Sequence, residues 1–188
     1  MRYAILALLA VLPLVQGCVP LVVGGAAATG VAVSQDRRTV GTITEDEGIE
    51  LRANGRLRDR FGENAYVSVT SYNRTVLLTG QVPDAQTRTE AERIARGVDN
   101  VRGVYNELAV AGLSSFTARS NDSIITSKVK ARFVDANKFN ALHVKVVTES
   151  SVVYLLGMVK KQEANDATEI ARTTSGVQKV VRIFEYID

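Results

Sequence analysis

An internal repeat constrains this chain of 188 residues more than any other feature. The segment Val76–Val82 (VLLTGQV) aligns with Val153–Val159 (VYLLGMV), 77 residues later. Further along, Ala91–Arg96 aligns with Ala167–Arg172 at a spacing of 76 residues. Because self-similarity at a fixed period encodes one structural unit per copy, the sequence predicts two copies of one small domain.

Two helices are expected in each copy. The first has an apolar residue every four positions, which marks one buried helix face: Ile49, Ala53 and Leu57 in the first copy, and Ile125, Val129 and Phe133 in the second. The second helix begins near Pro83-Asp84, where proline suits the first turn and aspartate can cap it. Its counterpart is expected over residues 161–174.

Three strands complete each copy. Two segments of alternating β-branched residues are separated by polar residues that suit hairpin turns, and a third strand follows the second helix; the expected ranges are 66–71, 75–82 and 103–110, then 143–148, 152–159 and 179–186. A β-α-β connection places two strands in parallel beside the hairpin. The predicted fold class is therefore α+β, with two tandem α-β-β-α-β domains, each a three-stranded mixed sheet with two helices on one face.

The two faces of the central strands differ in their expected neighbours. In the second copy Val153, Leu155, Gly157 and Val159 should face the helices, which leaves Tyr154, Leu156 and Met158 on the other side. The first copy has Leu77, Thr79 and Gln81 at the matching positions. We predict that packing of the two domains covers these residues.

The N-terminus has the order of a secretory signal peptide. Arg2 precedes an apolar run over residues 3–15, which is too short to span a bilayer, and the run closes on Gly17-Cys18. Cys18 is the only cysteine of the chain. The lipidation prediction is acylation of Cys18 after removal of residues 1–17, and the alternative is an ordinary signal peptide with an incidental cysteine.

Residues 18–45 are expected to form the acylated cysteine and a flexible tether. Pro20 and several glycines argue against a second membrane span in this segment. Its polar stretch over residues 36–42 is interpreted as solvated linker, with docking on a domain as the alternative. The two domains are then expected over residues 46–113 and 114–188.

These motifs together resemble a known family. Gly80 and Gly157 in their apolar strands, the Ile-Ala-Arg helices and the terminal Val-x-x-Val strands are similar to those of two BON domains. With the Gly-Cys signal ahead of them, the chain resembles the dual-BON outer-membrane lipoproteins of Gram-negative bacteria. The resemblance implies an anchor at Cys18 and, because Val19 rather than aspartate follows it, a place in the outer membrane facing the periplasm.

The resemblance also implies a function. The family binds anionic phospholipid through its second domain and is associated with outer-membrane integrity and with division. The first half, from 46 to 113, has nine arginines against ten acidic residues, whereas residues 114–188 have seven lysines and four arginines against eight acids. A modest positive excess of this kind suits an anionic lipid surface.

The candidate phospholipid-binding residues lie on the first helix of the second domain. If Ile125, Val129 and Phe133 face the core, Ile124 points away from it, beside lysines, as in a shallow interfacial contact. The predicted contact residues are Ser123, Ile124, Ser127, Lys128, Ala131 and Arg132. The alternative is that Ile124 packs against the first domain or the tether.

Other chemistry is poorly supported by the residues present. His143 is the only histidine, and without further thiols it cannot assemble a metal site or a catalytic constellation. We therefore expect no enzyme activity, no metal and no cofactor, and the basic residues are too sparse to predict nucleic-acid binding. The rival to lipid binding is a lipid-anchored adaptor for an envelope protein partner, for assembly or secretion. The sequence does not determine the oligomeric state; a monomer is favoured.

Overall fold

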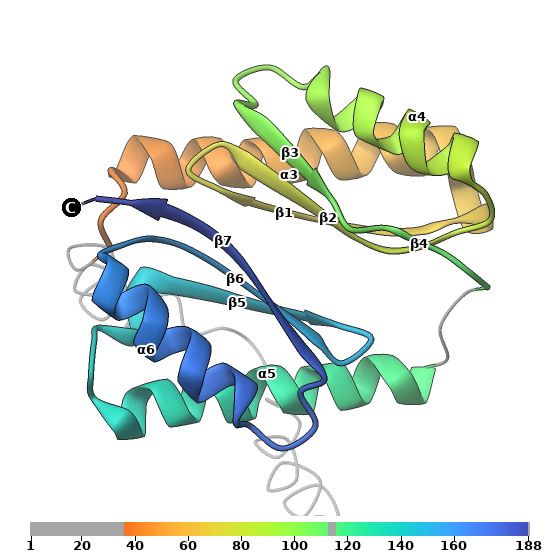
Figure 1. Ribbon diagram of the computed structural model, residues 1–188. Helices are drawn as coiled ribbons and strands as arrows, with labels where there is room; N and C mark the ends of the chain where they lie inside the picture. The colour runs from red at the N-terminus through yellow and green to blue at the C-terminus, as the bar shows by residue number, and fades with distance from the viewer. Residues whose placement is uncertain (1–35, 113–115, 188) are drawn as a thin grey trace, which may run out of the picture. The chain divides into compact units, whose positions relative to one another are not determined.

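Two copies of one α-β-β-α-β unit follow one another along the chain (Figure 1). The computed structural model describes residues 36–112 and 116–187. The predicted signal peptide, Cys18 and most of the tether fall outside the described residues. The predicted α+β fold class and the repeat are confirmed.

The first domain begins with a long helix, and a short sheet follows. Its elements are α3 (Val40–Phe61), η2 (Gly62–Asn64), β1 (Tyr66–Tyr72), β2 (Thr75–Val82), α4 (Ala85–Arg96), β3 (Gly103–Asn106) and β4 (Ala109–Val110). β1 is antiparallel to β2, and β3 and β4 are parallel to it, as the β-α-β rule predicts. The third strand, expected to be continuous, is interrupted at Glu107-Leu108, where the Leu108 side chain joins the core.

The second domain repeats this order with a complete third strand. Its elements are α5 (Phe116–Ala136), η3 (Ala141–His143), β5 (Val144–Glu149), β6 (Val152–Val159), α6 (Lys161–Arg172) and β7 (Lys179–Tyr186). β6 is antiparallel to β5 and parallel to β7 along its whole length. The range predicted for β7 agrees with the structure.

In each domain both helices lie on one face of the sheet and bury the predicted residues (Figure 1). Ile49, Ala53 and Leu57 join the core of the first domain with the inward residues of β2. Their counterparts Ile125, Val129 and Phe133 do the same in the second. The four-residue apolar spacing therefore identified the buried helix faces correctly.

A glycine in the central strand of each domain allows the hairpin backbone to pass close by. A Cβ atom on Gly80, whose φ is 121°, would lie 2.1 Å from the carbonyl oxygen of Tyr66. A Cβ atom on Gly157 would lie 2.4 Å from the carbonyl oxygen of His143. The repeated glycine is thus a steric requirement of this strand pairing.

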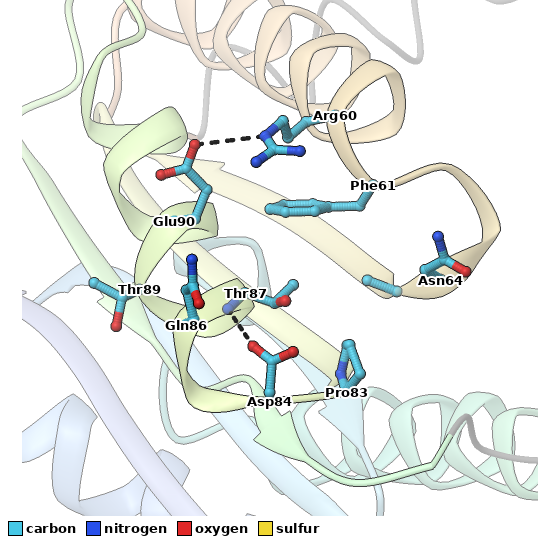
Figure 2. A pocket seen from close by; sticks show the side chains of 10 residues that line it. Arg60, Phe61, Asn64, Pro83, Asp84, Gln86, Thr87, Thr89 and Glu90 are labelled. Carbon is cyan, nitrogen blue, oxygen red and sulfur yellow. Dashed lines mark hydrogen bonds and ion pairs between the residues drawn. The ribbon is translucent and has the colours of Figure 1, made fainter.

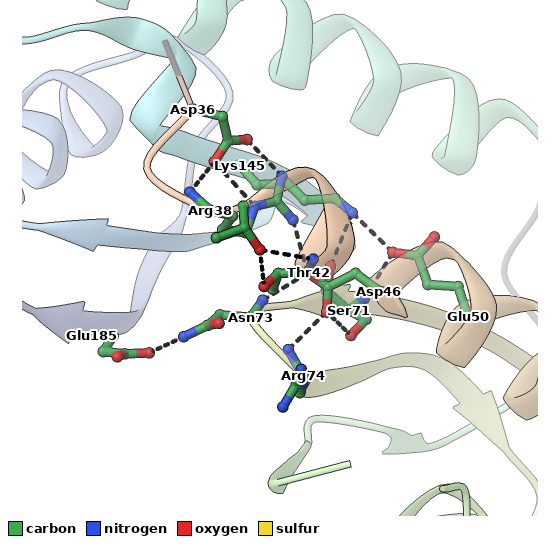
Figure 3. A network of polar contacts seen from close by, with 11 residues as sticks. Asp36, Arg38, Thr42, Asp46, Glu50, Ser71, Asn73, Arg74, Lys145 and Glu185 are labelled. Carbon is green, nitrogen blue, oxygen red and sulfur yellow. Dashed lines mark hydrogen bonds and ion pairs between the residues drawn. The ribbon is translucent and has the colours of Figure 1, made fainter. Parts of the chain in front are cut away.

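A buried aspartate fixes each hairpin turn to the first helix of its domain, and Figure 3 shows the one in the first domain. The carboxylate of Asp46 accepts hydrogen bonds from the Ser71 hydroxyl at 2.7 Å and from the backbone N–H groups of Asn73 at 2.8 Å and Arg74 at 2.7 Å. Asp122 accepts equivalent backbone bonds, each 2.8 Å long, from Ser150 and Ser151. Both turn residues in each domain have positive φ, which the aspartate helps to hold.

The outer faces of the two sheets bury one another, as predicted. Tyr72 and Leu77 of the first domain share an apolar cluster with Tyr154, Leu156 and Ile183 of the second. Met158 is packed against the same cluster. Both repeats accordingly belong to one compact unit.

Polar contacts surround this apolar interface. The Lys145 ammonium lies 2.8 Å from Glu50, and Gln81 donates a hydrogen bond of 2.6 Å to Glu149. Burial at this position raises the pKa of Glu149, and the hydrogen bond from Gln81 only partly opposes that rise. The ionised form of Glu149 is therefore less stable at this interface than in water.

The described end of the expected tether is folded, which corrects the interpretation of residues 36–42 as solvated linker and agrees with the alternative, docking on a domain. The Arg37 guanidinium donates to both carboxylate oxygens of Glu163, at 2.6 and 2.8 Å, and to the carbonyl oxygen of Met158 at 2.8 Å. Arg38 pairs with Asp46 at 2.9 Å and lies 4.0 Å above the centre of the Tyr72 ring. Two neighbouring arginines thus attach to different domains, and α3 begins directly after them.

Candidate phospholipid-binding surface

The first helix of the second domain separates its core face from a solvent face. Ile125, Val129 and Phe133 are buried, and a helix turns by 100° per residue. Ile124 therefore points away from the core, and 53% of its surface is exposed. Among the described residues it belongs to none of the three apolar clusters, which argues against the alternative, packing on the first domain or the tether.

Most of the predicted contact residues share this solvent face. Ser123, Ser127, Lys128 and Ala131 are all exposed beside Ile124. The Ser123 and Ser127 hydroxyls donate to backbone carbonyl oxygens one turn earlier, so they stay close to the helix surface. Neither serine side chain therefore projects far from the helix beside Ile124.

Arg132 makes contacts within the domain that the sequence did not predict. It is only half exposed, and its guanidinium donates to the Ile170 carbonyl at 2.9 Å and to the Thr174 hydroxyl at 2.8 Å. These bonds satisfy groups at the end of α6 and tie that end to α5. Arg132 thus lies on the flank of the helix and stabilises the domain.

The sequence analysis missed part of the exposed apolar surface. Val134, which follows Ala131 by three residues, has 66% of its surface exposed. Leu142, in the short η3 turn, is 48% exposed. Continuing the three- and four-residue spacing beyond Ala131 would have found Val134, whereas no helical period connects Leu142 to it.

Two lysines of this helix are available for a ligand. Lys128 and Lys130 are exposed, and no acidic side chain lies within ion-pair distance of either among the described residues. Lys138, by contrast, pairs with Asp166 at 3.3 Å. The surface thus combines two unpaired ammonium groups with exposed aliphatic side chains, the combination that favours an anionic lipid interface.

The first domain provides an internal comparison. Leu51 on α3 is 76% exposed, more than Ile124, but its helix carries five carboxylates against four arginines, whereas α5 carries two lysines and two arginines against two aspartates. The excess of carboxylates on α3 disfavours contact with an anionic surface, whereas the excess of cations on α5 favours it. Both first helices thus expose apolar side chains, but only α5 has a net positive charge.

The single histidine lies in a polar corner near the folded end of the tether. His143 Nδ1 is 3.8 Å from Glu163, the carboxylate that Arg37 holds. Hydrogen bonding from Arg37, followed by that from the Lys160 backbone and the nearby charges, lowers the pKa of Glu163 to about 2. Among the described residues no three potential ligands gather as a metal site would require.

None of the helices in the described part of the chain has the length and apolar character needed to cross a bilayer.

The BON-domain model matches residues 46–112 and 121–187. The chain belongs to the BON-domain family. The earlier resemblance is thereby confirmed, and both matched segments coincide with the repeats seen in the fold.

Relatives refine this membership. The chain is 40% identical over 175 residues to outer membrane lipoprotein DolP of Haemophilus influenzae, covering 92% of this chain and 90% of that protein. It is 34% identical to a 21 kDa hemolysin of Actinobacillus pleuropneumoniae, covering 81% and 79% of the two chains. It is also 31% identical to osmotically-inducible protein Y of Escherichia coli, covering 81% and 78%. These findings group the chain with the dual-BON outer-membrane lipoproteins.

Proposed function

We propose that this BON-family lipoprotein is a non-enzymatic protein whose second domain binds anionic phospholipids through the exposed face of α5. The observation that carries the proposal is the joint exposure of Ile124 and Val134 beside the unpaired Lys128 and Lys130. Such a surface attracts anionic headgroups by charge and inserts aliphatic side chains to a shallow depth. The chain has no tryptophan, so the inserted groups are aliphatic.

The proposed anchor and the proposed lipid surface have separate tasks. Several acyl chains at Cys18 would supply nearly permanent attachment. The α5 surface would then select which lipids, and hence which region of the periplasm-facing leaflet, the domains contact. We propose that this selection supports outer-membrane integrity, including at sites of division.

The experiment must remove the anchor without disturbing the fold. A fragment that begins at residue 46 would lose Arg37, Arg38 and the first turns of α3, so its failure to bind would be uninformative. A chain that begins at residue 18 and carries Cys18→Ser retains these residues, cannot be acylated and lacks the apolar run over residues 3–15. Its binding to vesicles is followed by flotation at low and high salt.

The expected result is flotation with vesicles that contain phosphatidylglycerol or cardiolipin, and none with phosphatidylcholine alone. High salt should release the protein, because the attraction is partly electrostatic. Lys128→Glu should weaken binding by roughly tenfold, whereas Lys179→Glu, an exposed lysine on β7, should have little effect. Absence of binding to anionic vesicles would favour the adaptor for a protein partner instead.

A further inference from the structure

A groove on the first BON domain is formed by residues that take no part in the lipid surface proposed for the second domain. It lies between the end of α3 and the start of α4 and has a volume of about 720 Å³ (Figure 2). Phe61 and Pro83 supply apolar surface, while Arg60 and Gln86 supply hydrogen-bond donors. Neighbouring hollows of about 410 and 320 Å³ share Arg60 and Pro83 with it, so the groove is elongated.

Comparison of the repeats shows why the groove is open in this domain. In the second domain Phe139, only 8% exposed, reaches back from the loop after α5 and packs on Phe133 with 5.1 Å between the ring centres. Lys138 then pairs with Asp166 on α6 beside it. In the first domain the loop residues Gly62–Asn64 are exposed and contribute no side chain to the apolar core.

The aromatic surface of the groove therefore remains accessible. Phe61, the last residue of α3, is only partly buried, and its ring points toward α4 (Figure 2). The side-chain amides of Asn64 and Gln86 have no hydrogen-bond partner among the described residues. A partly exposed ring between unpaired amides suits an extended peptide, which brings side chains and backbone polar groups together.

The charges of the groove select the kind of peptide. Three arginines, Arg56, Arg60 and Arg93, line its upper part with one carboxylate, Glu90. Arg93 already holds both oxygens of Glu90 at 2.7 and 2.9 Å, whereas Arg60 approaches it only to 3.6 Å. The Arg60 guanidinium therefore has donors to spare for another carboxylate.

The carboxylate at the other end of the groove is already used within the fold. Asp84 caps α4 by accepting the Thr87 backbone N–H at 2.7 Å. This bond, with the Thr87 side chain, lowers the pKa of Asp84. Together with the neighbouring hollow, the groove is lined by Arg56, Arg60 and Arg93 against Asp84 and Glu90, which leaves one net positive charge on the Arg60 side.

We infer that this groove binds an acidic, extended segment of a partner protein, with a carboxylate on Arg60 and an apolar side chain over Phe61. The inference is independent of lipid binding, since it uses other residues on the other domain. It assigns the two domains different ligands: lipid for the second and protein for the first.

The test uses the full chain in neutral detergent and a short fluorescent peptide that alternates glutamate with leucine. A peptide alternating lysine with leucine is the matched probe. Fluorescence anisotropy should show binding of the acidic peptide and at least tenfold weaker binding of the basic one. No lipid is added, so the outcome does not depend on the lipid proposal.

Variants locate the site. Arg60→Glu should weaken binding of the acidic peptide at least tenfold, and Gln86→Trp should block it by filling the groove from an exposed position. Arg96→Glu, an equal charge change on α4 outside the groove, should leave binding within about twofold. Circular dichroism checks that each variant is folded. Equal binding of both peptides, equal effects of Arg60→Glu and Arg96→Glu, or no binding by the wild-type chain would overturn the inference.

Discussion

Leu77 of the first BON domain and Leu156 of the second lie in one buried apolar cluster, and neither side chain is accessible to solvent. Each leucine occupies the sheet face that its own helices leave uncovered. The two small domains therefore stabilise one another, because each supplies part of the other's buried surface. This mutual burial makes the interface a necessary part of the fold.

Leu156→Asp should destabilise the whole unit by at least about 3 kcal/mol, because it places a carboxylate in this cluster. Thermal unfolding measures the loss, and small-angle scattering should show a larger radius of gyration. Val110→Asp is the matched control, since Val110 is 52% exposed on β4. Unchanged compactness and melting of Leu156→Asp would mean that the two sheets do not hold each other in solution.

The ion pair between Arg37 and Glu163 should contribute stability that disappears in acid. Arg37 lowers the pKa of Glu163 to about 2 from an ordinary value of 4.5. Because the folded-state pKa is the lower one, this stability is fully present above about pH 4.5 and is lost as the pH falls towards 2. Urea unfolding of wild type and Arg37→Ala across this range should give a difference that shrinks with falling pH. A difference that is independent of pH would refute the pairing.

The buried carboxylates Asp46 and Asp122 should differ in importance. Asp46→Ala leaves the Ser71 hydroxyl, two backbone N–H groups and the Nη1 group of Arg38 without their acceptor, whereas Asp122→Ala removes the acceptor of two backbone N–H groups. Each unsatisfied buried donor costs about 1–3 kcal/mol. Chemical denaturation should therefore show the larger loss for Asp46→Ala. Equal losses would indicate that the end of the tether adds nothing to the network.

Several parts of the fold followed from local sequence patterns. The four-residue spacing of Ile49, Ala53 and Leu57 and the alternation around Leu155 and Leu156 identified both buried faces. These patterns are informative because a helix or strand repeats its environment at a fixed period. The repeat then extended each prediction to the other domain.

Other parts depend on contacts between distant residues. Arg37 and Glu163 are 126 positions apart, and no local period predicts their pairing. The first turn of α3 contains Gly41 and β-branched residues, which have weak helix propensity, so its start at Val40 was missed. Arg132 was assigned to lipid on spacing alone, and its hydrogen bonds to the end of α6, 38 and 42 positions away, could not be predicted in this way.

Neither hairpin turn contains the glycine that usually marks such a turn in a sequence. Ser150 and Ser151 have φ values of 51° and 63°, a conformation that glycine adopts at less cost. Ser151→Gly should therefore stabilise the protein by about 0.5–1 kcal/mol in thermal or chemical unfolding. Ser127→Gly, in the middle of α5, should instead destabilise it by a similar amount. Destabilisation by Ser151→Gly would show that the turn is not strained.

The most direct test of lipid binding by the second domain compares two exposed aliphatic residues on corresponding helices. In the Cys18→Ser chain, Ile124→Glu and Leu51→Glu make equivalent changes on α5 and α3. Dissociation constants for cardiolipin-containing vesicles at low salt should rise roughly tenfold or more for Ile124→Glu, through lost insertion and added repulsion, and hardly at all for Leu51→Glu. Equal constants for both variants and the unsubstituted chain would contradict the assignment of the lipid surface to α5.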